Sequence, residues 1–311
     1  MNFISAFLKQ ILDAIYGWVG NYGVAVILFT LLIRIVLLPL DIKSKKSMRR
    51  MSKIQPKVTA LQQKYSKEPD KMNQKVQELY RKEQVSPLSG CLPMLISLPI
   101  LFCMYSAMRA VSNEHTVQML MDMMNGNTNP VFEGFLWIKN VFQPDSFMHS
   151  VVPYVGDELK MISAVGGSSI LTEANLEAVR AFLATDAYGE IAKSLGAFTV
   201  LQAPMVFFTI NIPQIVNGFF ILPLLAGGSQ LLSTKLLNNT QGQAADSTAQ
   251  QTTQMMTWMF PLFSIWICAT TSAGFSIYWV FVNIVQIVEQ YFLNLYFEKK
   301  DAGKPEEVID L

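Results

Sequence analysis

An apolar stretch near the start of the chain contains a single charged residue. Residues 23–40 read GVAVILFTLLIRIVLLPL, and the one charge among these eighteen residues is Arg34. At about 1.5 Å per helical residue the stretch reaches roughly 27 Å, close to the roughly 30 Å hydrocarbon core of a bilayer. The stretch therefore predicts a membrane-spanning helix with an arginine inside it.

An arginine at that depth needs a physical explanation. A charge inside a bilayer costs between about 2.5 and more than 10 kcal/mol unless it is paired, hydrated or able to reach the interface. One interpretation of Arg34 is a functional site in a polar cavity. The alternative is a snorkelling arginine whose aliphatic stem lets the guanidinium reach the headgroups.

Polar faces on other apolar segments favour the cavity. Thr30 lies one turn before Arg34 on the same side of its helix. The last apolar segment places five polar or amphipathic residues on one face, namely Ser276, Trp279, Asn283, Gln286 and Gln290. The second span does the same with Ser86, Ser89, Pro93 and Ser97. Three such faces favour a shared hydrated cavity, although ordinary hydrogen bonding between helices uses the same residue types.

The composition excludes several classes of protein. Only 15% of the residues are charged, against about 25% in soluble domains, and 51% are hydrophobic. The net charge of +1 creates no general field for nucleic acid, so we expect no DNA partner. The three cysteines, Cys91, Cys103 and Cys268, form no disulfide framework, and with only two histidines we predict no metal and no cofactor.

A basic loop follows the first span. Residues 41–86 contain thirteen of the 24 basic residues of the chain and five acids, and the positive-inside rule places such a loop in the cytosol. Apolar residues at helical spacing on both sides of Pro69 predict a helical hairpin. Four basic residues at its start are candidates for partner binding, namely Lys45, Lys46, Arg49 and Arg50. The hairpin is either a binding surface for an acidic or RNA-bearing partner, such as a ribosome, or a topogenic signal that contacts anionic lipid headgroups.

The remaining chain divides into apolar spans and polar connections. We expect an amphipathic interfacial helix (1–19), a first span (20–40), the basic hairpin (41–86), a second span (87–109), an outer segment (110–217, with an insertion over about 147–217), a third span (218–234), a cytosolic loop (235–254), a fourth span (255–270), a fifth span (275–297) and a cytosolic tail (298–311). Within the outer segment, residues 200–213 are apolar but interrupted by prolines, so we interpret them as interfacial or packed. Five spans with the basic hairpin inside place the N-terminus outside and the C-terminus in the cytosol.

Catalytic motifs are missing from the sequence. It contains no GxxxxGK[ST] or GxGxxG phosphate loop, and both histidines fall in the long outer segment. Glu289 is the only acid inside the later spans, and we interpret it as an interface residue near the inner end of its helix. The sequence therefore predicts a protein that is not an enzyme.

Five motifs in order resemble the YidC family of membrane protein insertases. They are IRIVLLPL (33–40), SPLSGCLPMLISLPILFCMYSAMR (86–109), FLWI (135–138), ILPLLAGGSQLL (221–232) and SAGFSIYWVFVNIVQIVEQYF (272–292). The resemblance implies an all-α integral membrane protein of the bacterial inner (plasma) membrane. It implies five transmembrane helices around a hydrophilic groove, with a cytosolic helical hairpin and an outer insert. The family's groove arginine falls on Arg34.

The chain departs from the family pattern at a few positions. Ser97 stands where the family usually has glutamine, and Val282 with Asn283 stands where it usually has two asparagines. The insertion over about 147–217 lies outside the resemblance.

The expected function follows from the groove and from the resemblance together. A substrate helix would enter the bilayer while its short hydrophilic tail crosses through the groove, without nucleotide hydrolysis. We expect six groove residues to contact the substrate, namely Thr30, Arg34, Ser97, Trp279, Asn283 and Gln286. The expected partners are nascent membrane proteins and membrane lipids, and a ribosome and a Sec translocon are both left open. A small-solute transporter and a non-translocating assembly chaperone are the alternatives.

Overall fold

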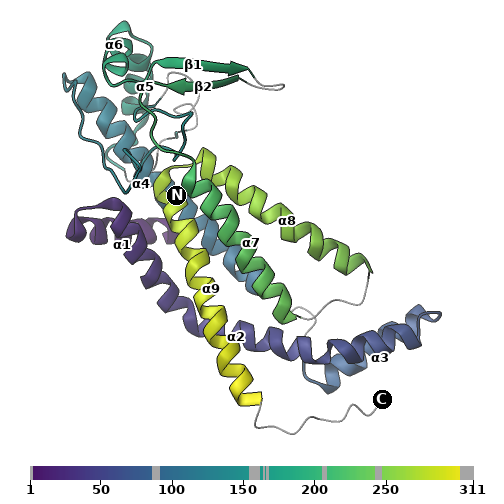
Figure 1. Cartoon of the computed structure of the whole chain (residues 1–311). Helices are drawn as coiled ribbons and strands as arrows, with labels where there is room; N and C mark the ends of the chain where they lie inside the picture. Colours follow the sequence, from purple (N-terminus) through teal and green to yellow (C-terminus); the bar gives the residue numbers. More distant parts are fainter. Residues whose placement is uncertain are drawn as a thin grey trace. The chain divides into compact units, whose positions relative to one another are not determined.

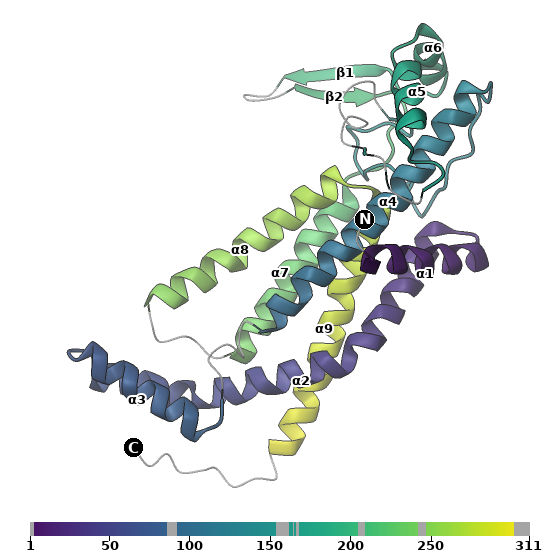
Figure 2. The ribbon, with the colours of Figure 1, turned by 180° about the vertical axis from the view of Figure 1, so that it is seen from behind.

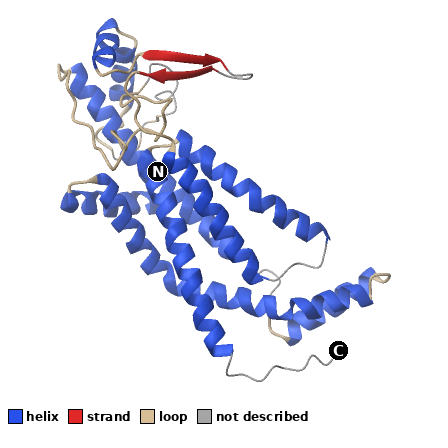
Figure 3. Cartoon of the chain, in the orientation of Figure 1, coloured by secondary structure: helices blue, strands red, loops and turns tan. Residues whose placement is uncertain are grey.

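The computed structural model describes residues 3–85, 92–153, 162–163, 165, 168–204, 209–241 and 247–301. These residues are mostly helical, as the sequence predicts, and their strands are confined to one short hairpin (Figures 1 and 3). The elements in chain order are α1 (Phe3–Val19), α2 (Tyr22–Lys64), α3 (Pro69–Lys82), α4 (Leu92–Met124), α5 (Glu173–Leu183), α6 (Asp186–Ser194), β1 (Thr199–Pro204), β2 (Thr209–Pro213), α7 (Ile221–Gln241), α8 (Ser247–Thr270) and α9 (Ala273–Asp301).

Two of the described helices are long and apolar enough to cross a membrane. They are α2 and the Ala273–Phe297 part of α9, and Thr257–Thr270 of α8 is a shorter apolar helix. The first span and the first arm of the basic hairpin form one continuous helix, because α2 runs through both Pro39 and Pro56. A proline removes one backbone hydrogen bond from a helix, and a helix of 43 residues tolerates that loss here.

The described chain divides into two compact units. The first unit comprises Met1–Thr30, Leu101–Gly227 and Phe263–Phe281. The second comprises Leu31–Ile100, Gly228–Leu262 and Val282–Leu311.

The first unit contains a hydrophobic core outside the expected spans. The C-terminal part of α4 contributes Val117, Leu120 and Met123. Helices α5 and α6 and the loops around them supply the other buried members, which are Val151, Val152, Ile162, Leu171, Leu176, Val179, Leu183, Tyr188 and Ala197. Helix α5 begins at a cap in which the Thr172 side chain accepts a hydrogen bond from the Asn175 amide, and α6 begins the same way at Thr185. The described residues within 147–217, the range expected to be an insertion, therefore include a folded helical subdomain built on the end of α4.

A two-stranded antiparallel sheet extends from this subdomain (Figure 2). β1 pairs with β2 in the register Leu201–Ile212 and Gln202–Asn211, with an irregularity between Thr199 and Leu201. The sequence predicted an interfacial or packed segment over residues 200–213, and it did not predict strands there. The described part of this segment forms two strands. Pro204 and Pro213 are compatible with them because both lie at strand ends, where a missing amide hydrogen costs no ladder bond.

A buried polar hub connects the loops of the first unit to the start of α7. The Asp145 carboxylate, fully buried, accepts hydrogen bonds from the Phe219 amide at 2.8 Å, the Leu222 amide at 2.7 Å and the Trp137 indole at 3.2 Å. A Cβ on Gly218 would clash with that carboxylate, so only glycine fits there. The hub therefore fixes where α7 begins.

A second amide reinforces the hub. The Asn217 side chain donates to the carbonyls of Asn140 at 2.9 Å and Pro144 at 2.8 Å, and it accepts from the Asn140 amide at 2.8 Å. Because each of these polar groups is buried, each hydrogen bond replaces one that water would otherwise make.

The second unit contains the basic hairpin formed by α2 and α3. Met48, Ile54 and Val58 are buried on α2, in agreement with an apolar seam along that arm. Lys57 Nζ lies 2.9 Å from Glu83 Oε1, which joins the two arms near the end of α3.

Candidate functional site

Helix α2 brings three charged residues onto one of its faces within the second unit. Arg34, Asp41 and Lys45 are spaced by seven and four residues, which is two helical turns and then one. Arg34 Nη1 lies 3.4 Å from Asp41 Oδ2, and the Arg34 side chain is only 12% exposed. The arginine therefore turns toward an acid of its own helix.

Helix α9 adds a fourth charge to this group. Lys45 Nζ lies 3.7 Å from Glu289 Oε2, and the two side chains are 17% and 11% exposed. Arg34 also acts electrostatically on both Lys45 and Glu289. We call Arg34, Asp41, Lys45 and Glu289 the charge cluster.

The charge cluster is neutral overall, and its contacts are long. Charge-assisted hydrogen bonds between nitrogen and oxygen are about 2.7–2.9 Å long, whereas the two pairs here measure 3.4 and 3.7 Å. Neither Lys45 Nζ nor Glu289 Oε2 makes a hydrogen bond to any described residue. The cluster thus compensates charge without locking its members into short contacts.

The polar face of α9 partly joins α9 to α7. Asn283, which is 3% exposed, donates from Nδ2 to Ser229 Oγ at 3.1 Å. Gln290 donates to Asn294 Oδ1 at 2.9 Å along the same helix, and Gln286 is half-buried. At Asn283 the structure therefore shows the interhelical hydrogen bonding that was the alternative interpretation of the polar face.

Two predicted groove residues lie in the first unit. The Thr30 hydroxyl, fully buried, donates to the Val26 carbonyl of its own helix at 2.7 Å. Trp279 is 7% exposed and packs with its ring centroid 5.6 Å from that of Phe275, and its indole nitrogen has no acceptor among the described residues. Ser97 belongs to helix α4, but the structure does not describe its side chain.

The predicted groove residues are therefore divided between the two units. Arg34, Asn283 and Gln286 belong to the second unit, and Thr30 and Trp279 belong to the first. The sequence interpreted Glu289 as an interface residue near the inner end of its helix and gave it no partner; in the structure it is half-buried and lies beside Lys45. Opposite charges toward the C-terminal ends of two apolar segments were the signal that could have paired Lys45 with Glu289.

The four candidate residues of the basic hairpin fall into two pairs. Lys45 contacts Glu289, and the Arg49 guanidinium lies 5.0 Å from the centroid of the Phe297 ring, so both interact with α9. Lys46 and Arg50 are exposed. Only this second pair presents its charge to the surroundings.

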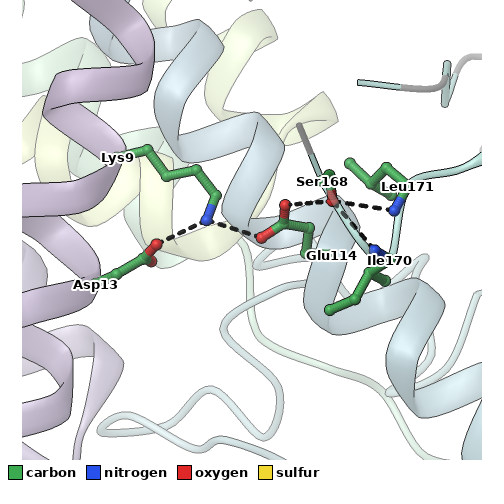
Figure 4. A network of polar contacts seen from close by, with 6 residues as sticks. All are labelled: Lys9, Asp13, Glu114, Ser168, Ile170 and Leu171. Atoms are coloured by element: carbon green, nitrogen blue, oxygen red, sulfur yellow. Dashed lines mark hydrogen bonds and ion pairs between the residues drawn. The ribbon is translucent and has the colours of Figure 1, made fainter. Parts of the chain in front are cut away.

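A separate polar network connects α1 to α4 and to the insertion within the first unit (Figure 4). Lys9 Nζ lies 2.6 Å from Asp13 Oδ2 and 2.8 Å from Glu114 Oε2, and Ser168 Oγ donates to Glu114 Oε1 at 2.7 Å. Burial lowers the pKa of Lys9, but the hydrogen bonds with the two carboxylates outweigh it and raise the pKa above its usual value. Lys9 therefore stays charged in the folded protein.

Comparisons with known proteins identify the family of this chain. The family model described as "60Kd inner membrane protein" matches residues 14–300. The proteins named "Membrane protein insertase YidC" from Caldanaerobacter subterraneus subsp. tengcongensis and from Fusobacterium nucleatum are 29% and 26% identical to the chain. Both alignments cover 94% of this chain, and they cover 94% and 95% of the two relatives. The chain belongs to the YidC family. The prediction from its five motifs is confirmed.

Longer relatives belong to the same family. The protein of that name from Treponema denticola is 29% identical over 94% of this chain, which corresponds to 37% of the relative's own length.

Proposed function

We propose that the chain is a membrane protein insertase of the bacterial inner membrane and that its substrates are nascent membrane proteins. Its membership of the YidC family and the name shared by its relatives support this function. We further propose five spans, with the N-terminus outside and the C-terminus in the cytosol, because the basic hairpin follows the first span.

The charge cluster carries the mechanistic part of the proposal. Arg34 is largely shielded, yet its resident acid Asp41 lies 3.4 Å away rather than at a close charge-assisted distance. An acidic group of a substrate tail can replace Asp41 beside the guanidinium without breaking a short bond. Arg34 would thus offset the tail's charge for part of its passage, when an unpaired carboxylate would be most costly.

The neighbouring charges make this exchange reversible. When a substrate acid approaches Arg34, the displaced Asp41 remains close to Lys45, since both lie on the same face of α2. The cluster can therefore accept and release one negative charge while its own groups keep partners.

Polar side chains on other helices would complete the groove. We assign to it Thr30, Ser97, Trp279, Asn283 and Gln286 together with Arg34. Trp279 supports this assignment, because its buried indole nitrogen lacks an acceptor among the described residues and could donate to a passing peptide carbonyl. Burial of the substrate's hydrophobic helix in lipid supplies the driving force, so the step requires no nucleotide.

The exposed pair on the basic hairpin is the proposed contact for a further partner. Lys46 and Arg50 are exposed, whereas Lys45 and Arg49 contact α9. A ribosome or anionic lipid would bind Lys46 and Arg50, and substituting these two residues should weaken such binding without loosening α9.

Insertion into vesicles tests the role of Arg34. Purified Arg34→Ala, Arg34→Lys and wild-type protein are reconstituted, and protease protection of a client's N-terminal tail is measured for acidic and neutral tails. We expect Arg34→Ala to slow insertion of the acidic-tailed client by roughly tenfold, the factor that corresponds to about 1.4 kcal/mol. Arg34→Lys should retain most of the activity.

The controls separate a specific effect from a general one. Lys46→Ala removes an exposed charge from the same helix and should leave the ratio of acidic to neutral clients unchanged. Equal insertion of both clients by Arg34→Ala and by wild type would remove the charge-pairing role, while the family function would stand.

A further inference from the structure

The β1–β2 hairpin is anchored at its base, and beyond the base its described side chains are exposed or half-buried. At the base, Ala197 belongs to the core of the first unit, and Ile215 packs against that core. Gly196 has a φ of +69°, and a Cβ there would meet the Ile215 side chain at 2.5 Å. Beyond this anchor Val200 and Leu201 are 56% and 55% exposed, and Figures 1 and 2 show the strands extending away from α5 and α6.

The two faces of the hairpin differ in chemistry. Residues paired across antiparallel strands point to the same face, and successive residues alternate between faces. Leu201 and Ile212 therefore share one face with Ile210, whereas Gln202 and Asn211 share the other. The hairpin has an apolar face and a polar face.

This arrangement is unstable in water alone. A two-stranded hairpin without a covering layer is marginal at best in water. Edge strands of soluble proteins usually carry charges that discourage association, but residues 197–214 include no Asp, Glu, Lys or Arg. On the apolar face Leu201 is exposed and Ile210 and Ile212 are half-buried, so an apolar covering would stabilise this face.

We propose that the β1–β2 hairpin lies on the membrane surface with its apolar face among the lipid headgroups and upper acyl chains. The bilayer is available to this chain because the chain belongs to a family of membrane proteins and contains membrane-spanning helices. An uncharged amphipathic surface suits the interface, where the polar face and the outer strand edges remain hydrated.

Pairing with a strand of another protein fits the hairpin less well. Strand addition needs a regular edge of free amides and carbonyls. Pro204 and Pro213 have no amide hydrogen to offer, and the irregularity between Thr199 and Leu201 distorts the edge of β1. The lipid surface makes no such demand on the edges.

The proposal stands apart from the insertase mechanism, since it requires only that the chain reside in a bilayer. The test uses full-length protein in which Cys91, Cys103 and Cys268 are replaced and one cysteine is introduced at a time. Each variant carries a spin label and is reconstituted in vesicles of phosphatidylethanolamine and phosphatidylglycerol. The relative accessibility of the label to oxygen and to a water-soluble nickel chelate reports its depth.

Alternation along the strands is the expected signature. Labels introduced by Leu201→Cys and Ile212→Cys should be accessible to oxygen and shielded from nickel. Labels introduced by Gln202→Cys and Asn211→Cys serve as matched controls and should be accessible to nickel. Equal nickel accessibility at all four positions overturns the proposal, as does shielding that appears only at high protein-to-lipid ratio.

A second measurement uses the unaltered chain and is independent of cysteine replacement. Wild-type protein is reconstituted with a phospholipid that carries a photoreactive group near the top of one acyl chain. After irradiation, lipid adducts are expected on peptides that include residues 197–204 or 209–214. Adducts on the α2 and α9 peptides without adducts on either hairpin peptide would contradict the proposal.

Discussion

The buried hub of the first unit and the charge cluster of the second solve the same problem in opposite ways. Both place charged groups where water is scarce. Asp145 accepts three hydrogen bonds, and the two shorter than 2.9 Å come from backbone amides at the start of α7, which cannot move without unfolding it. Arg34 and Lys45 instead lie 3.4 and 3.7 Å from their acids.

The difference separates a structural charge from an exchangeable one. A carboxylate saturated by backbone amides fixes a fold, because its loss leaves several buried donors unpaired. A neutral group of four charges with long contacts keeps its compensation while individual partners change. This contrast is the physical basis for placing substrate contact at Arg34 rather than at Asp145.

The largest effect should follow a change at the hub. Asp145→Ala leaves the Phe219 and Leu222 amides and the Trp137 indole without their acceptor, so we expect a loss of about 2–5 kcal/mol in the stability of the first unit. This loss of stability is measured from the thermal unfolding of the protein in detergent, with limited proteolysis as the probe of unfolding. Asp145→Asn keeps one acceptor oxygen and should cost clearly less; equal stability of Asp145→Ala and wild type would show that the hub is not structural.

A double-mutant cycle on Lys45 and Glu289 should give a smaller coupling. Because their contact is long and their side chains are mostly shielded, we expect a coupling energy of about 1–2 kcal/mol from Lys45→Met, Glu289→Gln and the double variant. Chemical unfolding of each variant in the same detergent supplies the values. A Lys45–Glu289 coupling energy as large as the stability lost in Asp145→Ala would contradict the proposed difference between the charge cluster and the hub.

The weakest expected effect concerns the link between α1 and the insertion. Glu114→Gln keeps a hydrogen-bond acceptor for Ser168 but removes the charge that faces Lys9, so we expect a loss of about 1 kcal/mol or less. Amide hydrogen exchange of the segment around Ser168 and of α1 is the measurement. Lys9→Met should loosen α1 more than the Ser168 segment, and the reverse order would show that the network is not continuous.

Helical periodicity and family motifs predicted more of this molecule than local chemistry did. The strong period of the apolar spans anticipated the helices, and the order of the motifs identified the family. Strands β1 and β2 escaped prediction because the prolines that end them look like simple interruptions in the sequence. The apolar and polar faces also emerge only when the register between the strands is known.

The candidate site was predicted in part. Arg34 stood out because a charge inside an apolar span is rare, and Asn283 stood out through helical spacing. Lys45 and Glu289 lie on helices far apart in the sequence, so only their opposite charges beside two apolar segments could have indicated the pairing. The same holds for Asp145, whose three donors come from residues on both sides of the insertion.

Photocrosslinking to a nascent client tests the central claim most directly. A photoreactive amino acid is placed at Gln286, on the polar face of α9, or at Val288, a neighbour that is 47% exposed and serves as the control. A client with an acidic tail is then stalled during insertion. The account predicts crosslinks from Gln286 to the polar tail, weakened by Arg34→Ala, and none to the tail from Val288. Insertion that proceeds without tail crosslinks at Gln286, or with equal crosslinks at both positions, would contradict it.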